Sequence, residues 1–169
     1  MILDGALVFT GTPGIPPGTS TAWDTPTTGT QQSTNVIDLV NPRDLGIADD
    51  PSLKLLVQVM TTFTGGTSID VQLQGAPDNG SGSPGAYTTM WDSTAIVEAN
   101  LLQGTYIANV DLPRIFGPTP LKPGIQVLPR FLRLQWVSVG THGAGNLYGA
   151  IVIDREDMIA YPPGVVIAN

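Results

Sequence analysis

Apolar and polar residues alternate with period two through the stretch from Leu53 to Leu73. The apolar positions form two rows, which are Leu55, Val57, Val59 and Phe63, then Ile69, Val71 and Leu73. This alternation is typical of strands with one buried face. Because Gly65 and Gly66 separate the rows, we interpret the stretch as a β-hairpin. An odd loop of three or five residues would place Phe63 against Ile69 and Val59 against Leu73.

Further short strands are predicted on both sides of this hairpin. Their ranges are Ile2–Phe9, Asn35–Val40, Ala86–Met90, Thr94–Ala99, Thr105–Leu112, Phe131–Val139 and Leu147–Ile153. The glycine-rich segment from Gly140 to Asn146 is predicted to turn the chain between the last two. No segment has a convincing helical period longer than two turns.

The strand pattern predicts a single all-β domain over residues 1–169. Short strands separated by loops that contain many of the 20 glycines and 15 prolines are typical of an antiparallel β-sandwich. A jelly roll is the preferred architecture, and an immunoglobulin-like sandwich is the second choice.

Two segments are predicted to lie outside the regular strands. Residues from about 10 to 32 are mostly Thr, Ser, Gly, Pro and Gln, and they predict an extended arm or loop in which Trp23 and Asp24 are exceptions. A long segment of this kind is often functional. Trp23 either folds back on its own domain or lies on a partner. Residues from about 158 to 169 are apolar but broken by Pro162 and Pro163, which suits a tail that packs on another surface.

The charge content restricts the partners. Only 12% of the residues are charged, against about 25% in typical domains, and the net charge is −7. Seven scattered Lys and Arg residues form no basic stripe, so nucleic-acid binding is not expected. A surface poor in Lys and Glu is typical of large contact areas. The chain has no cysteine, which excludes disulfides and thiolate metal sites.

Neither a leader nor a membrane segment is expected. The start, Met-Ile-Leu-Asp, has no basic region of the kind that begins a signal peptide. No apolar run approaches the roughly 18 residues that a membrane-spanning helix needs.

Candidate chemistry is sparse. The single histidine, His142, has no evident partner for catalysis, and one histidine cannot build a His-cluster metal site. Asp92 and Glu98 are a conceivable glycosidase pair. The oxygen-rich loop from Asp78 to Ser83 could hold calcium, but it lacks a closing Glu and also fits an ordinary turn. We therefore expect no enzyme activity, no cofactor and no metal.

Several motifs carry a resemblance to a known family. They are Ser33–Leu39, Asp44–Ile47, Phe63–Ser68, Gln74–Asp78, Leu128–Leu134, Ile153–Arg155 and Tyr161–Gly164. These segments resemble the small capsid cement, or decoration, proteins of tailed bacteriophages. The similarity covers roughly Gln32 to Gly164, and its motifs are structural turns and strands. The arm from Thr10 to Gln31 is longer than the family leads us to expect, which leaves its role open.

The resemblance implies a jelly-roll protein that is made in the host cytoplasm and placed on the outer surface of the virion head. Its partners would be the major capsid protein and a second copy of itself in a homodimer. The candidate contact residues for the capsid or the dimer are Trp23, Asp24, Tyr161, Pro162, Pro163 and Val165. The alternative from another class is a carbohydrate-binding module that stacks sugars on Trp23, Trp91 or Tyr148.

Overall fold

Two long strands form the centre of the fold. The computed structural model describes residues 7–12, 23–42, 53–113 and 128–153. Within them, β3 (Leu53–Ala76) has 24 residues and β7 (Phe131–Ile153) has 23. The two strands pair antiparallel along nearly their whole length, from Leu53 opposite Ile153 to Ala76 opposite Phe131.

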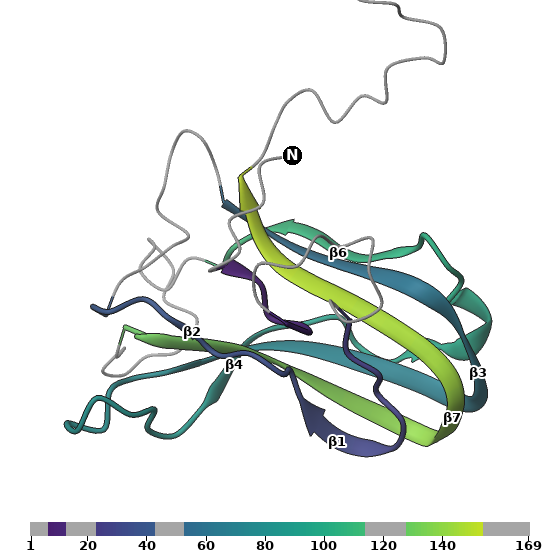
Figure 1. Ribbon diagram of the computed structural model, residues 1–169, viewed down its shortest axis with the longest axis horizontal. Helices are drawn as coiled ribbons and strands as arrows, with labels where there is room; N and C mark the ends of the chain where they lie inside the picture. The colour runs from purple at the N-terminus through teal and green to yellow at the C-terminus, as the bar shows by residue number, and fades with distance from the viewer. Residues whose placement is uncertain (1–6, 13–22, 43–52, 114–127, 154–169) are drawn as a thin grey trace, which may run out of the picture.

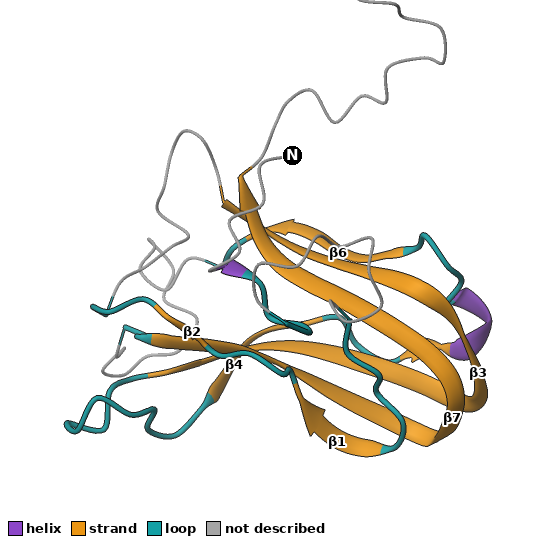
Figure 2. Cartoon of the chain, in the orientation of Figure 1, coloured by secondary structure: helices purple, strands orange, loops and turns teal. Residues whose placement is uncertain are grey.

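The shorter strands add to the edges of this ribbon (Figure 2). The first half of β3 pairs with β6 (Tyr106–Asp111), and the second half pairs with β4 (Thr88–Asp92) and β5 (Ile96–Val97). The first half of β7 pairs with β1 (Gly29–Gln32) and β2 (Ile37–Asp38). A short 3₁₀ helix, η4 (Glu98–Asn100), follows β5 near the end of the ribbon where it bends.

The ribbon folds over near its middle, so that its two halves become two layers (Figure 1). The register shifts several times between Val59 and Ser68, and three residues of β7 oppose Gly65 alone. Such bulges bend a strand pair. Gly65 and Gly140 have φ angles of +90° and +81°, which glycine adopts without strain. We call the half with β6 layer one and the half with β1, β2, β4 and β5 layer two.

The main core lies between the layers. Leu55, Val57 and Val59 of layer one belong to the same buried cluster as Val71 and Leu73 of layer two. All five side chains are fully buried. Because both apolar rows of β3 face the same interior, folding the ribbon removes both from water in one step.

This arrangement confirms the predicted all-β antiparallel sandwich, in which a rolled ribbon builds both layers as a jelly roll requires. The predicted hairpin is wrong, because Phe63 and Ile69 lie on one continuous strand and do not face each other. The predicted turn from Gly140 to Asn146 is wrong for the same reason. In both places the glycines bend the strand instead of reversing it, since each half has a partner in the opposite long strand.

The shorter strands agree more closely with prediction. β6 falls within Thr105–Leu112, while Asn35–Val40 contains only the two-residue β2. Four residues of the predicted arm form β1, and Val8 and Asp24 make bridges to Ala150 and Leu147. Much of the arm and of the strand predicted at Ile2–Phe9, and all of the tail from 158, lie outside the described residues.

Candidate functional site

The outer face of layer two carries a row of side-chain amides. The register places Gln32 of β1 beside Gln135 of β7, Gln135 beside Gln72 of β3, and Gln72 beside Asp92 of β4. Directly paired residues point to the same side of a sheet, so these four side chains form one row across four strands. With Gln74, Arg133 and Thr89 in the next row, we call this surface the amide face.

Hydrogen bonds connect the side chains of the amide face. Gln72 Oε1 accepts bonds from Gln135 Nε2 and Thr89 Oγ1, both at 3.2 Å. Arg133 Nε donates to Gln74 Oε1 at 2.9 Å, and its guanidinium lies 3.7 Å from the centroid of the Tyr87 ring. These hydrogen bonds hold the amides of Gln72, Gln74 and Gln135 in place. Sequence reasoning missed this face, although Gln72 and Gln74 alternate with buried residues.

Two carboxylates meet at the edge of the amide face. Gln72 Nε2 donates to Asp70 Oδ2 at 2.8 Å and to Asp92 Oδ2 at 3.4 Å, so one amide bridges both groups. Partial burial raises the pKa of Asp70, and the neighbouring Asp92 carboxylate raises it further, because a second negative charge disfavours ionisation.

The pair differs from the one predicted for a glycosidase. Asp92 shares a hydrogen-bond partner with Asp70, while Glu98 lies in η4 beyond β5. Among the described residues, no hydrogen bond or ion pair joins Glu98 to Asp92. The Asp70–Asp92 pair also lies on a sheet face and does not line the cleft described next. The expectation that the protein is not an enzyme stays a prediction.

A polar cleft of about 230 Å³ lies beside β1. Its lining residues are Trp23, Asp24, Thr25, Pro26, Gln31, Gln32, Thr34 and Trp136. Trp23 is half-buried and also packs against a second apolar cluster, which contains Leu56 and Tyr148. The volume is below the roughly 300–1,000 Å³ of sites for drug-sized ligands, so the cleft fits one small unit at most.

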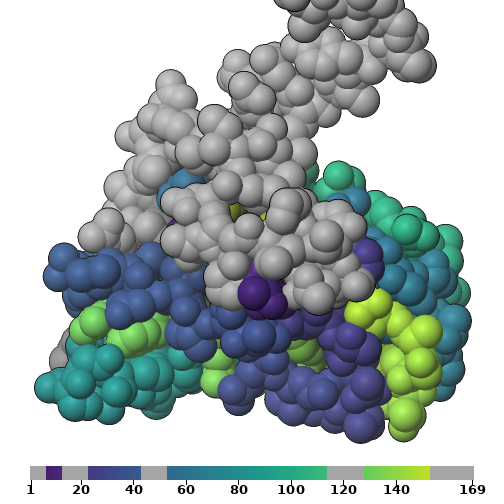
Figure 3. All heavy atoms as spheres, in the orientation of Figure 1, coloured from purple at the N-terminus to yellow at the C-terminus, as the bar shows by residue number. Residues whose placement is uncertain are grey.

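Asp24 has an internal role in this region. Its carboxylate accepts bonds from Gly11 N at 3.0 Å, Thr34 N at 2.9 Å and Thr34 Oγ1 at 2.5 Å. Asp24 is 7% exposed, and these bonds fasten the segment before β1 both to Gly11 and to Thr34, which follows β1. In the space-filling view, residues 23–42 form a band across the visible face (Figure 3). A capsid contact by Asp24 or Trp23 stays a prediction.

Of the other proposed sugar platforms, Tyr148 is buried and Trp91 is partly buried. Tyr148 is 2% exposed, so the prediction that it stacks a sugar is wrong. Trp91 lies opposite Leu73 and packs against the main core. Trp23, in contrast, lines the cleft described above.

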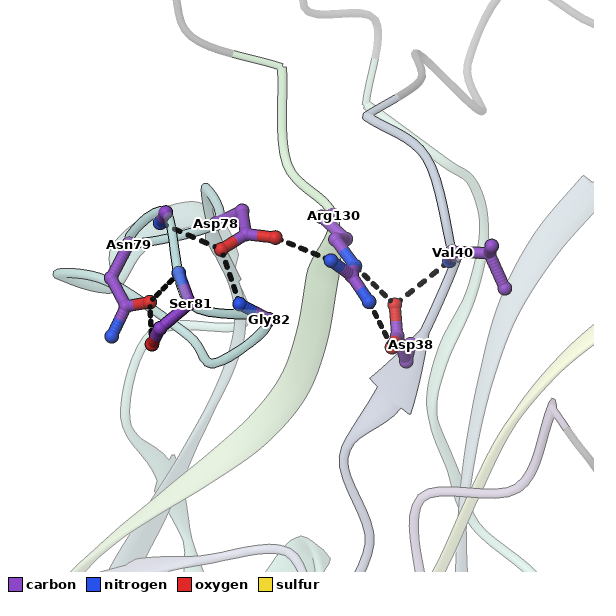
Figure 4. Close-up of polar contacts among 8 residues, drawn as sticks. Asp38, Val40, Asp78, Asn79, Ser81, Gly82 and Arg130 are labelled. Carbon is purple, nitrogen blue, oxygen red and sulfur yellow. Dashed lines mark hydrogen bonds and ion pairs between the residues drawn. The ribbon is translucent and has the colours of Figure 1, made fainter.

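The loop that follows β3 is held by its own donors and by an arginine (Figure 4). Asp78 Oδ1 accepts bonds from Gly80 N at 2.8 Å and Gly82 N at 3.0 Å, while Asp78 Oδ2 accepts a bond from Arg130 Nη1. The same guanidinium binds Asp38 through two bonds of 2.8 and 2.9 Å. Calcium would have to compete with all these donors, and a cation beside Arg130 would be repelled.

The Arg130 cluster shifts the pKa of both carboxyl groups. The bond from Arg130 holds the pKa of Asp38 below its usual value, and the Val40 N–H adds to the effect. The Gly80 N–H is the main cause of the lowered pKa of Asp78, with Arg130 contributing less. The two carboxylates in turn raise the pKa of Arg130. The cluster joins β2, the loop after β3 and the residue that precedes β7, and sequence reasoning missed it.

His142 is a structural residue at the bend of β7. It is 3% exposed, its backbone N–H donates to Thr27 O at 2.8 Å, and Nε2 lies 3.4 Å from Ser68 O. Its ring meets that of Phe63 edge-on, with 5.2 Å between the centroids. The ring is therefore packed inside the bend, and the expectation that His142 has no catalytic role stays a prediction.

Four predicted contact residues, Tyr161, Pro162, Pro163 and Val165, lie outside the described residues. Within the described ranges, no three His, Cys, Asp or Glu side chains gather as a metal site would require. The same part of the chain contains no helix that is long and apolar enough to cross a membrane.

The chain matches a known protein family. A family model with the description Bbp16 matches residues 24–151, which is more than half of the chain and includes β1 to β6 and nearly all of β7. No curated protein matches the chain.

Proposed function

The chain belongs to the Bbp16 family, and we propose that it is a structural virion protein. In this proposal it binds the outer surface of a tailed-phage head as a cement protein and stabilises contacts between major capsid proteins. The resemblance of its turns and strands to phage cement proteins supports the proposal, as does the jelly-roll sandwich. A homodimer on the virion surface is part of the same proposal.

The observation that carries the proposal is the amide face. Protein contact surfaces are depleted of charge at their centres, and the central row of this face is three glutamines ending at one aspartate. Because the amides already bond to one another, docking would order few additional side chains.

The size of the face indicates that the arms must also take part. Four strands about 4.8 Å apart span about 14 Å, and the residues of β3 from Ser68 to Gln74, at about 3.3 Å each, span about 23 Å. The face therefore covers roughly 300 Å². A stable interface buries about 800 Å² on each partner. The predicted contacts at Trp23 and in the tail from Tyr161 to Val165 would supply part of the remaining area.

Heating phage heads with and without the protein tests the proposal. We expect heads that carry it to lose their integrity at a higher temperature, because a bound cement protein stabilises the assembled state. Equal melting temperatures would contradict cementing. Sedimentation of the free protein tests the dimer.

The second candidate is a carbohydrate-binding module, and the cleft beside Trp23 favours it. The cleft combines an indole ring with the amides of Gln31 and Gln32, which suits one uncharged sugar unit. Binding to a glycan panel that is lost in Trp23→Ala but retained in Trp91→Ala would support this candidate. No binding by the wild-type protein would remove it.

A further inference from the structure

One end of the amide face is apolar. Ser68 of β3 pairs with Val139 of β7 on one side and with Val97 of β5 on the other. The two valines are 52% and 53% exposed. A single exposed valine needs no explanation, but these two flank one buried serine on the same side of the sheet. Val137 lies two residues before Val139 on β7 and pairs with Asp70.

The same end is acidic. Asp70 follows Ser68 by two residues on the outer side of β3, and Asp92 shares the Gln72 amide with it. Among the described residues, neither carboxylate makes an ion pair. The cation of the amide face is Arg133, and it is already bonded to Gln74 and stacked on Tyr87. The negative charge of Asp70 and Asp92 is therefore not neutralised within the face.

We propose that this end, made of Val97, Val139, Asp70 and Asp92, docks onto a capsid-protein segment that presents a Lys or Arg beside aliphatic side chains. The aliphatic stem of such a residue would lie against the valines while its charged head reaches the carboxylates. This inference rests on the proposed cement function and specifies which surface acts and what the partner must offer.

A basic side chain fits the two carboxylates better than a metal ion does. Asp70 Oδ1 accepts a bond from Ser93 Oγ at 3.3 Å, and Asp92 Oδ1 accepts one from Thr94 N at 2.5 Å. Calcium takes six to eight oxygen ligands, and these two partly committed groups cannot supply them. A single ammonium or guanidinium group needs only one or two of the oxygen lone pairs that these hydrogen bonds leave free.

Binding to purified heads that lack the protein tests the inference. The double variant D70N/D92N keeps the shape of both side chains and removes both charges. We expect it to bind at least about tenfold more weakly at low salt than the wild type. Wild-type binding should weaken as salt is added, and binding of the double variant should respond much less. V97T/V139T, which keeps shape but removes apolar surface, should also bind more weakly.

Two single-residue controls make the same kind of chemical change elsewhere. Asp111→Asn removes the charge of a side chain that is 75% exposed and lies near Lys54. Val36→Thr alters a valine that is 47% exposed. Both should bind heads as the wild type does. If D70N/D92N binds with wild-type affinity and salt response, the docking inference is wrong while the cement function stands. If the wild-type protein does not bind heads, both fail together.

Discussion

The imidazole ring of His142 occupies the space that a side chain at Gly66 would need. An ideal Cβ on Gly66 would lie 2.1 Å from Cε1 of His142. The two residues come from the two long strands at the point where the ribbon folds over. At the bend, a position without a side chain on β3 therefore accommodates a buried ring from β7.

Gly66→Ala is expected to destabilise the fold. The added methyl group cannot fit unless the buried ring moves away from Phe63 and Ser68. Overpacking of this kind typically costs about 1–3 kcal/mol in the free energy of unfolding. Urea unfolding followed by circular dichroism measures the change. In an H142A background the same substitution should cost much less, because the obstructing ring is gone.

Gly143→Ala is the matched control for this prediction. An added Cβ at Gly143 would have only Thr64 O nearby, at 3.9 Å, which is ordinary contact. We expect a change within about 0.5 kcal/mol. Equal effects of the two substitutions would contradict the role assigned to the His142 ring.

Asp24→Ala is expected to loosen the segment that precedes β1. The substitution leaves the N–H groups of Gly11 and Thr34 without their acceptor, which costs about 1–3 kcal/mol. Thr34→Val removes only the hydroxyl bond and should cost about 0.5–1.5 kcal/mol. Urea unfolding of each variant would measure these changes in the free energy of unfolding. An Asp24→Ala variant with unchanged stability would show that these bonds do not hold the segment.

The sequence pattern predicts the fold class correctly, but it does not predict that β3 and β7 continue through the bend. Period-two alternation identifies the strands because it depends on burial of one face. The hairpin was wrong because two glycines and an average strand length of five to six residues both favour reversal. The inward residues of β3 from Leu55 to Leu73 are all odd-numbered. A hairpin with an odd loop and one continuous strand both produce this parity, so the pattern alone cannot distinguish them.

The outer face could be predicted only in part. Gln72 and Gln74 alternate with the buried Val71 and Leu73, so their outward direction follows from the pattern. Their neighbour Gln135 is 61 positions or more away in the chain, and only the pairing of β3 with β7 brings it near. The cluster of Arg130 with Asp38 and Asp78 depends on equally distant contacts.

Removing calcium is expected to leave the stability unchanged. The oxygens of Asp78 are used by Gly80, Gly82 and Arg130, so the loop is closed without an ion. The melting temperature should be the same in excess calcium and in excess EDTA. A rise in melting temperature that depends on calcium concentration would show a binding site that these contacts do not predict.

Arg130→Met is expected to lower the melting temperature at neutral pH and to matter less in acid. The carboxyl groups of Asp38 and Asp78 have lower pKa values in the folded protein than their ordinary value of 3.8. Their contribution to stability is thus complete above that value and is lost as the pH falls through the folded pKa values. The difference in melting temperature between wild type and variant should shrink below about pH 4.

The two carboxyl groups should respond differently to the same substitution. Arg130 is the main cause of the low pKa of Asp38, whereas the N–H of Gly80 is the main cause for Asp78. In Arg130→Met the pKa of Asp38, measured by NMR titration, should therefore rise closer to its ordinary value than that of Asp78. Arg133→Met, which removes a cation bonded to Gln74, is the control and should shift neither. Equal shifts at both carboxyl groups would mean that the loop donors do not act independently of Arg130.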